Sequence, residues 1–192
     1  MIVRILQSFA VAAILSVSLA YAQDVDAAKQ MKRDVGAWNV VIKMFVDPSG
    51  KPAVGKGVET NFMLGDLWLI GRVKGDIMGG SFEGLRQTGF DPEKKKFVAS
   101  WVDSKTPYST HVEGDWDEKT QTMTLIGTDK GPSGNEVKTK MVVAYNKDGS
   151  RTFTMYAIMN GKEMKMMECH YTRVDDKPAK SGEQKDKPGS EK

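Results

Sequence analysis

A cluster of sulfur and imidazole side chains near the end of the chain has the residue types that bind soft metal ions. It comprises Met164, Met166, Met167, Cys169 and His170, and such ligands together favour copper(I). In an extended strand, however, successive side chains point to opposite faces, which separates Met164, Met166 and His170 from Met167 and Cys169. Methionine also fills irregular space in apolar cores. We therefore interpret the cluster as packing and predict no metal site.

Ser104, His111 and Asp115 are the residue types of a hydrolytic triad. Ser104 lies in a turn-like Ser-Lys-Thr-Pro segment, and no strand-to-helix elbow would present it as a nucleophile. The sequence has no P-loop, no dinucleotide-binding glycine pattern and no zinc-ligand spacing. We predict no catalytic residues, and the sequence favours a protein that is not an enzyme.

The composition fits one globular domain with tails. The 192 residues include 28 Lys and Arg against 25 Asp and Glu, a net charge of +3. Positive and negative residues are thus nearly equal in number, and so small an excess of positive charge gives no basic field that would bind nucleic acid. Cys169 is the only cysteine, so no intramolecular disulfide can form and the fold must depend on its core.

The first 22 residues have the features of a secretory signal peptide. A basic start, Met1–Arg4, precedes an apolar run that ends in Ala20-Tyr21-Ala22, the small-residue pattern of a cleavage site. We expect the protein to be exported, periplasmic or secreted, with no stable membrane span after cleavage. A short N-terminal helix is expected within residues 23–35, a barrel domain over 36–174 and a disordered charged tail over 175–192.

Alternating polar and apolar residues after position 36 predict an all-β domain. Turn-forming clusters separate the runs, and Asn160-Gly161 predicts a type I′ hairpin turn. Without crossover helices the strands must be antiparallel, and closure into an up-and-down barrel removes their edges. The ten predicted strands are Trp38–Val46, Val54–Leu64, Leu67–Gly75, Gly80–Phe90, Phe97–Asp103, Tyr108–Trp116, Thr122–Thr128, Glu136–Asn146, Arg151–Asn160 and Lys162–Arg173.

The apolar faces of these strands indicate which residues line the lumen. Arg86 shares a face with Phe82 and Phe90, and an inward arginine would need a partner such as Asp103 or a ligand carboxylate. The candidates to line a ligand site are Trp68, Arg86, Trp101, Tyr108, Met141, Tyr145, Phe153 and Met155.

The two ends of the predicted barrel resemble the calycin superfamily of lipocalin-like barrels. Gly36-Ala37-Trp38 enters the first strand and Tyr171-Thr172-Arg173 ends the last. In that superfamily a G-x-W tryptophan packs against a late arginine at the closed end. The resemblance therefore implies a barrel-closing pair of Trp38 and Arg173, in which a guanidinium stacks on an indole.

The chain also resembles the bacterial domain-of-unknown-function family numbered 1579, over about Met31 to Val174. The likeness rests on Leu64–Leu69, Phe82-Glu83-Gly84, Gly89–Pro92 with Phe97–Ser104, and Met167–Arg173. It implies an exported calycin-like barrel and leaves its activity open.

Some calycin barrels that resemble nitrobindin bind haem through a late-strand histidine, and His170 is the matching candidate. If Arg173 points inward, the alternation of side chains along the strand makes His170 point outward, unless a bulge between them shifts this alternation. We therefore predict no haem cofactor.

The leading expectation is non-catalytic binding of a small apolar or amphipathic molecule in the lumen, with Arg86 as an anchor for an acid group. The alternative is a structural or interaction protein of the cell envelope whose barrel is filled by its own side chains. The sequence does not indicate an oligomeric state.

Overall fold

The computed structural model describes residues 27–45, 51–131 and 134–174. The predicted signal peptide, the first residues of the predicted helix and the predicted tail therefore lie outside the described residues. In the described part of the chain, no helix has both the length and the apolar character needed to cross a membrane.

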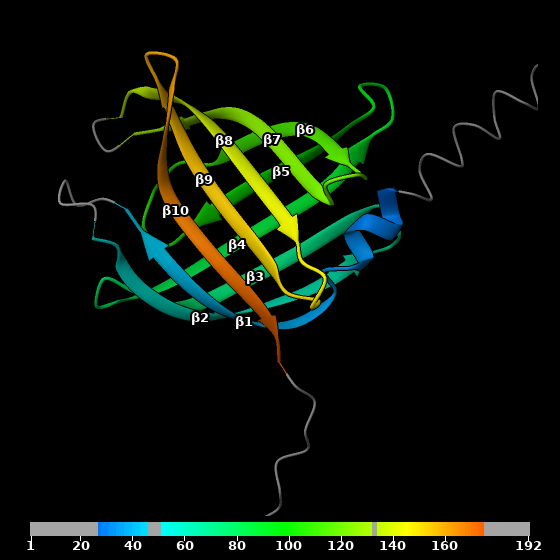
Figure 1. The fold of residues 1–192 in the computed structure, drawn as a ribbon, viewed down its shortest axis with the longest axis horizontal. Coiled ribbons are helices and arrows are strands. Elements are labelled where there is room, and N and C mark those ends of the chain that lie inside the picture. Colours follow the sequence, from blue (N-terminus) through cyan, green and yellow to red (C-terminus); the bar gives the residue numbers. More distant parts are fainter. Residues whose placement is uncertain (1–26, 46–50, 132–133, 175–192) are drawn as a thin grey trace, which may run out of the picture.

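The chain forms a closed antiparallel barrel of ten strands, as predicted (Figure 1). Each strand pairs with the next along the chain, and β1 pairs with β10 to close the cylinder. Each predicted strand end lies within two residues of the observed one. The strands are β1 (Gly36–Met44), β2 (Ala53–Leu64), β3 (Trp68–Ile77), β4 (Gly80–Asp91), β5 (Lys96–Asp103), β6 (Thr110–Asp117), β7 (Thr122–Lys130), β8 (Glu136–Tyr145), β9 (Arg151–Met159) and β10 (Lys162–Arg173).

The predicted hairpin turn joins β9 to β10. Asn160 and Gly161 both have positive φ angles, 52° and 74°, the conformation that a type I′ turn requires. A bulge in β10 shifts its register on β9 between Lys165 and Met167. As a result Met164 pairs with inward Ala157 and shares the face of Met167, not that of His170 as the simple alternation predicted.

One end of the barrel is covered by a short helix over residues 27–32 and the linker that follows it (Figure 1). Ala27 and Met31 of this helix are buried in the main core with Leu69, Phe97 and other inward residues. We call this the closed end. The opposite end, at which β9 turns into β10, is called the open end.

Candidate functional site

Four charged side chains form a buried cluster at the closed end, which we call the floor cluster: Asp34, Glu59, Arg86 and Arg151. Asp34 comes from the linker before β1, Glu59 from β2, Arg86 from β4 and Arg151 from β9. The Arg86 Nη2 atom lies 3.2 Å from Asp34 Oδ2 and 3.0 Å from Glu59 Oε1. Arg151 forms ion pairs with Asp34 and, at 2.8 Å, with Glu59 Oε2. Two carboxylates and two guanidinium groups thus balance one another, as buried charges require.

The linker is attached to the barrel mainly through Asp34. Its carboxylate accepts a hydrogen bond from the Tyr145 hydroxyl at 3.0 Å. Its backbone oxygen accepts one from Trp38 Nε1 at 2.8 Å and one from Asn61 Nδ2 at 3.0 Å. Strands β1, β2 and β8 therefore all bond to the residue that covers the floor.

Trp38 and Arg173 are directly opposite each other on β1 and β10, and the Arg173 guanidinium lies 4.0 Å from the centre of the Trp38 ring system. Arg151 lies over the same indole at 4.6 Å. Arg173 also donates hydrogen bonds to the backbone oxygens of Val35 and Arg33. The pair implied by the sequence resemblance is thus in contact, and it also holds the linker.

The G-x-W pattern has a physical reason in this structure. Gly36 has a φ angle of 110°, and a Cβ atom there would lie 2.9 Å from Arg173 Nη1. A side chain at this position would be strained and would displace the guanidinium from Trp38. Glycine is therefore needed two residues before the tryptophan.

The charges of the floor cluster stabilise one another. Burial acts to raise the pKa of Asp34, but the positive charges of Arg151 and Arg86 outweigh burial and hold this pKa below its ordinary value of 3.8. Burial acts to lower the pKa of Arg86, and Glu59 and Asp34 outweigh it in the same way, so this pKa is raised. Asp34 and Arg86 are therefore both charged at neutral pH.

This arrangement predicts a pH-dependent contribution of Asp34 to stability. Because the pKa of Asp34 is lowered in the folded state, its contribution is complete above about pH 4 and is lost as the pH falls through the folded-state pKa. Asp34→Asn should lower the free energy of unfolding at pH 7. The difference from the wild type should shrink between pH 4 and lower pH, as measured by urea unfolding at several pH values.

Asp66→Asn is the matched control for Asp34→Asn. Asp66 also has a lowered pKa, because of Lys32, but it lies on the surface. Its replacement should change the free energy of unfolding little at any pH. A constant difference between the wild type and Asp34→Asn from pH 7 to pH 2 would contradict the assigned role of Asp34.

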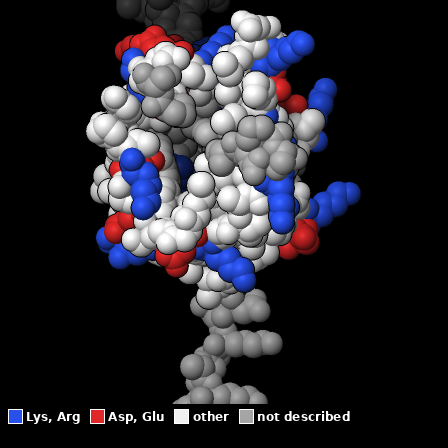
Figure 2. All heavy atoms as spheres, turned by 90° about the vertical axis from the view of Figure 1, so that its left-hand side faces the viewer, with Lys and Arg blue, Asp and Glu red and all other residues white. Residues whose placement is uncertain are grey.

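Above the floor, the barrel wall is apolar and partly open to solvent. Phe82, Trp101, Met141, Met155 and Met167 point inward but are only half-buried. Inward residues nearer the closed end, such as Leu69 and Phe97, are fully buried. Figure 2 looks onto the open end and shows a hollow in the surface, bordered mostly by uncharged side chains.

Six of the eight predicted lining residues lie on the inward face: Arg86, Trp101, Met141, Tyr145, Phe153 and Met155. Phe82 stacks on Trp101 with ring centres 6.0 Å apart. Gly84 makes room for this indole, because a Cβ atom there would lie 2.2 Å from it. Tyr145 lies at the floor, where burial raises its pKa, and its hydroxyl is bonded to Asp34.

Two predicted lining residues lie elsewhere. Trp68 is on the outer face of β3, because Leu69, Gly71 and Val73 are the buried positions of that strand. Both faces of this strand carry apolar residues in the sequence, so alternation did not distinguish them. Tyr108 is exposed in the loop before β6, which begins at Thr110 and not at Tyr108 as predicted.

Arg86 points inward, but Asp103 is not its partner. The Asp103 carboxylate accepts a hydrogen bond from Trp101 Nε1 at 2.9 Å and bonds to the backbone of the following turn. The positive charge of Arg86 is instead neutralised by Asp34 and Glu59. Its side chain is 23% exposed, so it forms the part of the floor cluster that reaches solvent-accessible space.

The candidate ligands for metal or haem do not converge. His170 is exposed and pairs with Val41 and Thr152 on the outer face, as the inward position of Arg173 predicted. Cys169 is buried on the inward face, and burial raises the pKa of its thiol to about 12. In the ranges that the structure describes, no group of three or more His, Cys, Asp or Glu side chains could hold a metal ion.

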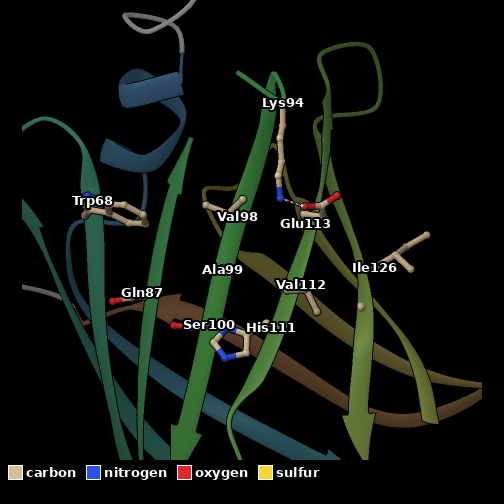
Figure 3. Close-up of a pocket in the computed structure, with 11 residues that line it drawn as sticks. Trp68, Gln87, Lys94, Val98, Ala99, Ser100, His111, Val112, Glu113 and Ile126 are labelled. Carbon is tan, nitrogen blue, oxygen red and sulfur yellow. Dashed lines mark hydrogen bonds and ion pairs between the residues drawn. The ribbon is translucent and has the colours of Figure 1, made fainter. Parts of the chain in front are cut away.

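A separate groove of about 420 Å³ lies on the outer face of β3 to β7 (Figure 3). Trp68 stands on one side of it and Ile126 on the other, with the ion pair of Lys94 and Glu113 at one end. The strand walls separate this groove from the lumen.

Sequence reasoning missed Asp34, Glu59 and Arg151 of the floor cluster. Arg151 shares its face with Phe153 and Met155, so the inward direction of β9 already placed an arginine in the core. A buried cation requires a buried acid as its partner. This requirement could have directed the search to an inward acid such as Glu59.

A family model described as "Protein of unknown function (DUF1579)" matches residues 25–173. No curated protein matches the chain. Among solved structures, a redesigned β-barrel has a TM-score of 0.38 and 15% identity, covering 78% of this chain and 96% of its own. The redesigned β-barrel mFAP1 bound to DFHBI has a TM-score of 0.37 and 16% identity, covering 77% and 98%. The family match spans most of the sequence, and the chain therefore belongs to the DUF1579 family.

Proposed function

We propose that this protein is exported and holds a small apolar or amphipathic molecule in the lumen of its barrel, without catalysis. The observation that carries the proposal is the partial exposure of inward side chains at mid-barrel, including Met141 and Met155. The outer surface of a closed barrel cannot expose such side chains, so solvent-accessible space must lie inside.

The chemistry of this space favours an apolar occupant. Its wall consists of aromatic and thioether groups, which adapt to irregular apolar shapes. Arg86 is the one charged group of the floor that is partly exposed, and its charge is already balanced by Asp34 and Glu59. An uncharged polar group on the ligand fits this floor better than the acid group that the sequence suggested.

The floor cluster supports the proposal structurally. Ion pairs and hydrogen bonds from β1, β2, β4, β8 and β9 meet at the linker before β1, so the closed end is fixed. Entry from the open end is the remaining route to the lumen. Export is supported by the sequence of residues 1–22 alone.

A matched pair of variants on β5 tests lumen binding. Ala99 points inward and Val102 points outward on the same strand. Ala99→Trp should fill the lumen and weaken binding of the apolar dye N-phenylnaphthylamine by at least about tenfold. Val102→Trp should leave the dye affinity unchanged. Both are measured by fluorescence titration after unfolding curves have shown that each variant folds.

Met155→Ala supplies a second test if Ala99→Trp fails to fold. This substitution enlarges the lumen. It should raise the affinity for larger dyes relative to the affinity for smaller ones. Native mass spectrometry of gently purified protein should also show a bound mass. Equal dye affinity for the wild type and a folded Ala99→Trp variant would refute lumen binding and favour a structural or interaction protein with a filled barrel.

A further inference from the structure

The groove on the outer face of β3 to β7 is built around the exposed ring of Trp68. The Trp68 indole lies directly over Gly89 of β4, where a Cβ atom would come within 2.5 Å of it. Glycine thus lets the ring lie flat on the sheet. The indole remains 36% exposed and presents an apolar surface at one side of the groove.

Polar side chains cross the groove beside this ring. Gln87, Ser100 and His111 are direct cross-strand neighbours on β4, β5 and β6, and all three line the groove. Over the described ranges, the Gln87 amide and the Ser100 hydroxyl make no side-chain hydrogen bond, and His111 Nε2 lies 3.0 Å from Ser109 Oγ. An amide, a hydroxyl and an imidazole together offer both donors and acceptors to a ligand.

The groove carries no net charge that would select an ion. Lys94 and Glu113 are the charged residues that line it, and they are paired at 2.8 Å. Val98 lies beside Glu113, and Ile126 follows on the next strand, so apolar surface continues beyond Trp68. The groove therefore combines a flat aromatic platform, apolar flanks and unpaired neutral polar groups.

We propose that this groove binds a neutral saccharide. A pyranose ring has an apolar C–H face that packs on an indole and a rim of hydroxyl groups that exchange hydrogen bonds with amide, hydroxyl and imidazole groups. A volume of about 420 Å³ suits one or two sugar units, and the open outer position admits a longer chain. The site is independent of the lumen and of the function proposed for it.

The test follows the indole N–H signals of the wild type by nitrogen–proton NMR. The chain has four tryptophans, and loss of one signal in Trp68→Phe identifies Trp68. The probes are maltohexaose, cellohexaose and chitohexaose, each titrated to about 10 mM. We expect at least one of them to shift the Trp68 signal and to leave the Trp101 signal in place.

Variants then assign the contacts. Trp68→Ala should weaken binding of the active oligosaccharide by about tenfold or more, and Gln87→Ala by about fivefold. Phe62→Ala is the matched control, because Phe62 is an exposed aromatic residue on the outer face of β2 outside the groove. The control should bind like the wild type.

Three results would overturn the saccharide proposal. They are the absence of a Trp68 shift with all three probes, unchanged affinity in a folded Trp68→Ala variant, and a Trp68 shift that depends on protein concentration without sugar. The last would assign the groove to contact between two copies of the chain. Each result leaves the lumen experiment on Ala99 unaffected.

Discussion

Replacing Arg151 with methionine is expected to lower the free energy of unfolding by about 3–5 kcal/mol. Methionine keeps most of the volume but removes a buried charge that pairs with both Asp34 and Glu59. Arg86 would then face two buried carboxylates alone, and an uncompensated buried charge is costly. Urea unfolding of the wild type and Arg151→Met at pH 7 measures the difference.

A second substitution separates charge from packing in this result. Arg151 also lies 4.6 Å from the centre of the Trp38 ring and 4.3 Å from that of Tyr171, so its loss removes contacts as well. The double variant Arg151→Met with Glu59→Leu restores charge balance between Asp34 and Arg86. It should regain a large part of the lost stability. If it is no more stable than the single variant, packing of the guanidinium, and not its charge, explains the loss.

Lys130→Met is the control for Arg151→Met. Lys130 forms an ion pair with Glu136 at 3.3 Å on the surface, where such pairs contribute up to about 1 kcal/mol. A loss on Arg151→Met no larger than that on Lys130→Met would contradict the role of the floor cluster.

The strand order could be predicted because each strand has its own signal in the sequence. Alternation marked the runs, and local turn residues such as Asn160 and Gly161 separated them. Closure followed from the absence of crossover helices and from the cost of free edges. These are local or general properties, so they do not depend on knowing which distant residues meet.

The floor cluster could not be predicted in this way, because its members meet only after closure. Asp34 lies in a linker without periodicity, and Glu59 lies in a strand whose outward face carries Val58 and Phe62. The inward face of β2 is instead largely glycine and polar residues, among them Gly55, Gly57 and Asn61. The outward face of β2 thus carries more apolar side chains than its inward face, so a count of apolar residues does not identify the inward face of this strand.

The inward polar side chains of β2 need space where they face β3. A Cβ atom on Gly71 would lie 2.4 Å from Asn61 Oδ1 and 3.2 Å from Glu59 Oε1, so this glycine on β3 gives the inward polar groups their space. Phe62 of β2 and Trp68 of β3 lie on the outer face, where they remain exposed. The outer surface of β2 and β3 therefore carries exposed aromatic side chains, and one of them, Trp68, forms the platform of the outer groove.

Trp38→Ala is expected to lower the free energy of unfolding by about 3–5 kcal/mol, the range for removing a large buried aromatic side chain. Trp38 is 2% exposed and supports both Arg151 and Arg173. Trp38→Phe keeps a ring between β1 and these guanidinium groups but removes the hydrogen bond from Nε1 to the Asp34 backbone oxygen, so it should cost about 1–3 kcal/mol. Urea unfolding measures both.

Trp68→Ala is the matched control for Trp38→Ala, because it removes the same side chain from the outer face of the barrel. Its effect on the free energy of unfolding should be clearly smaller, since the Trp68 indole is partly exposed already. Equal losses at the two positions would mean that the closed end is no more important for stability than the outer wall. A large loss at Trp38, with an intermediate loss for Trp38→Phe, would show that one indole joins the linker, the first strand and the last strand into a single closed end.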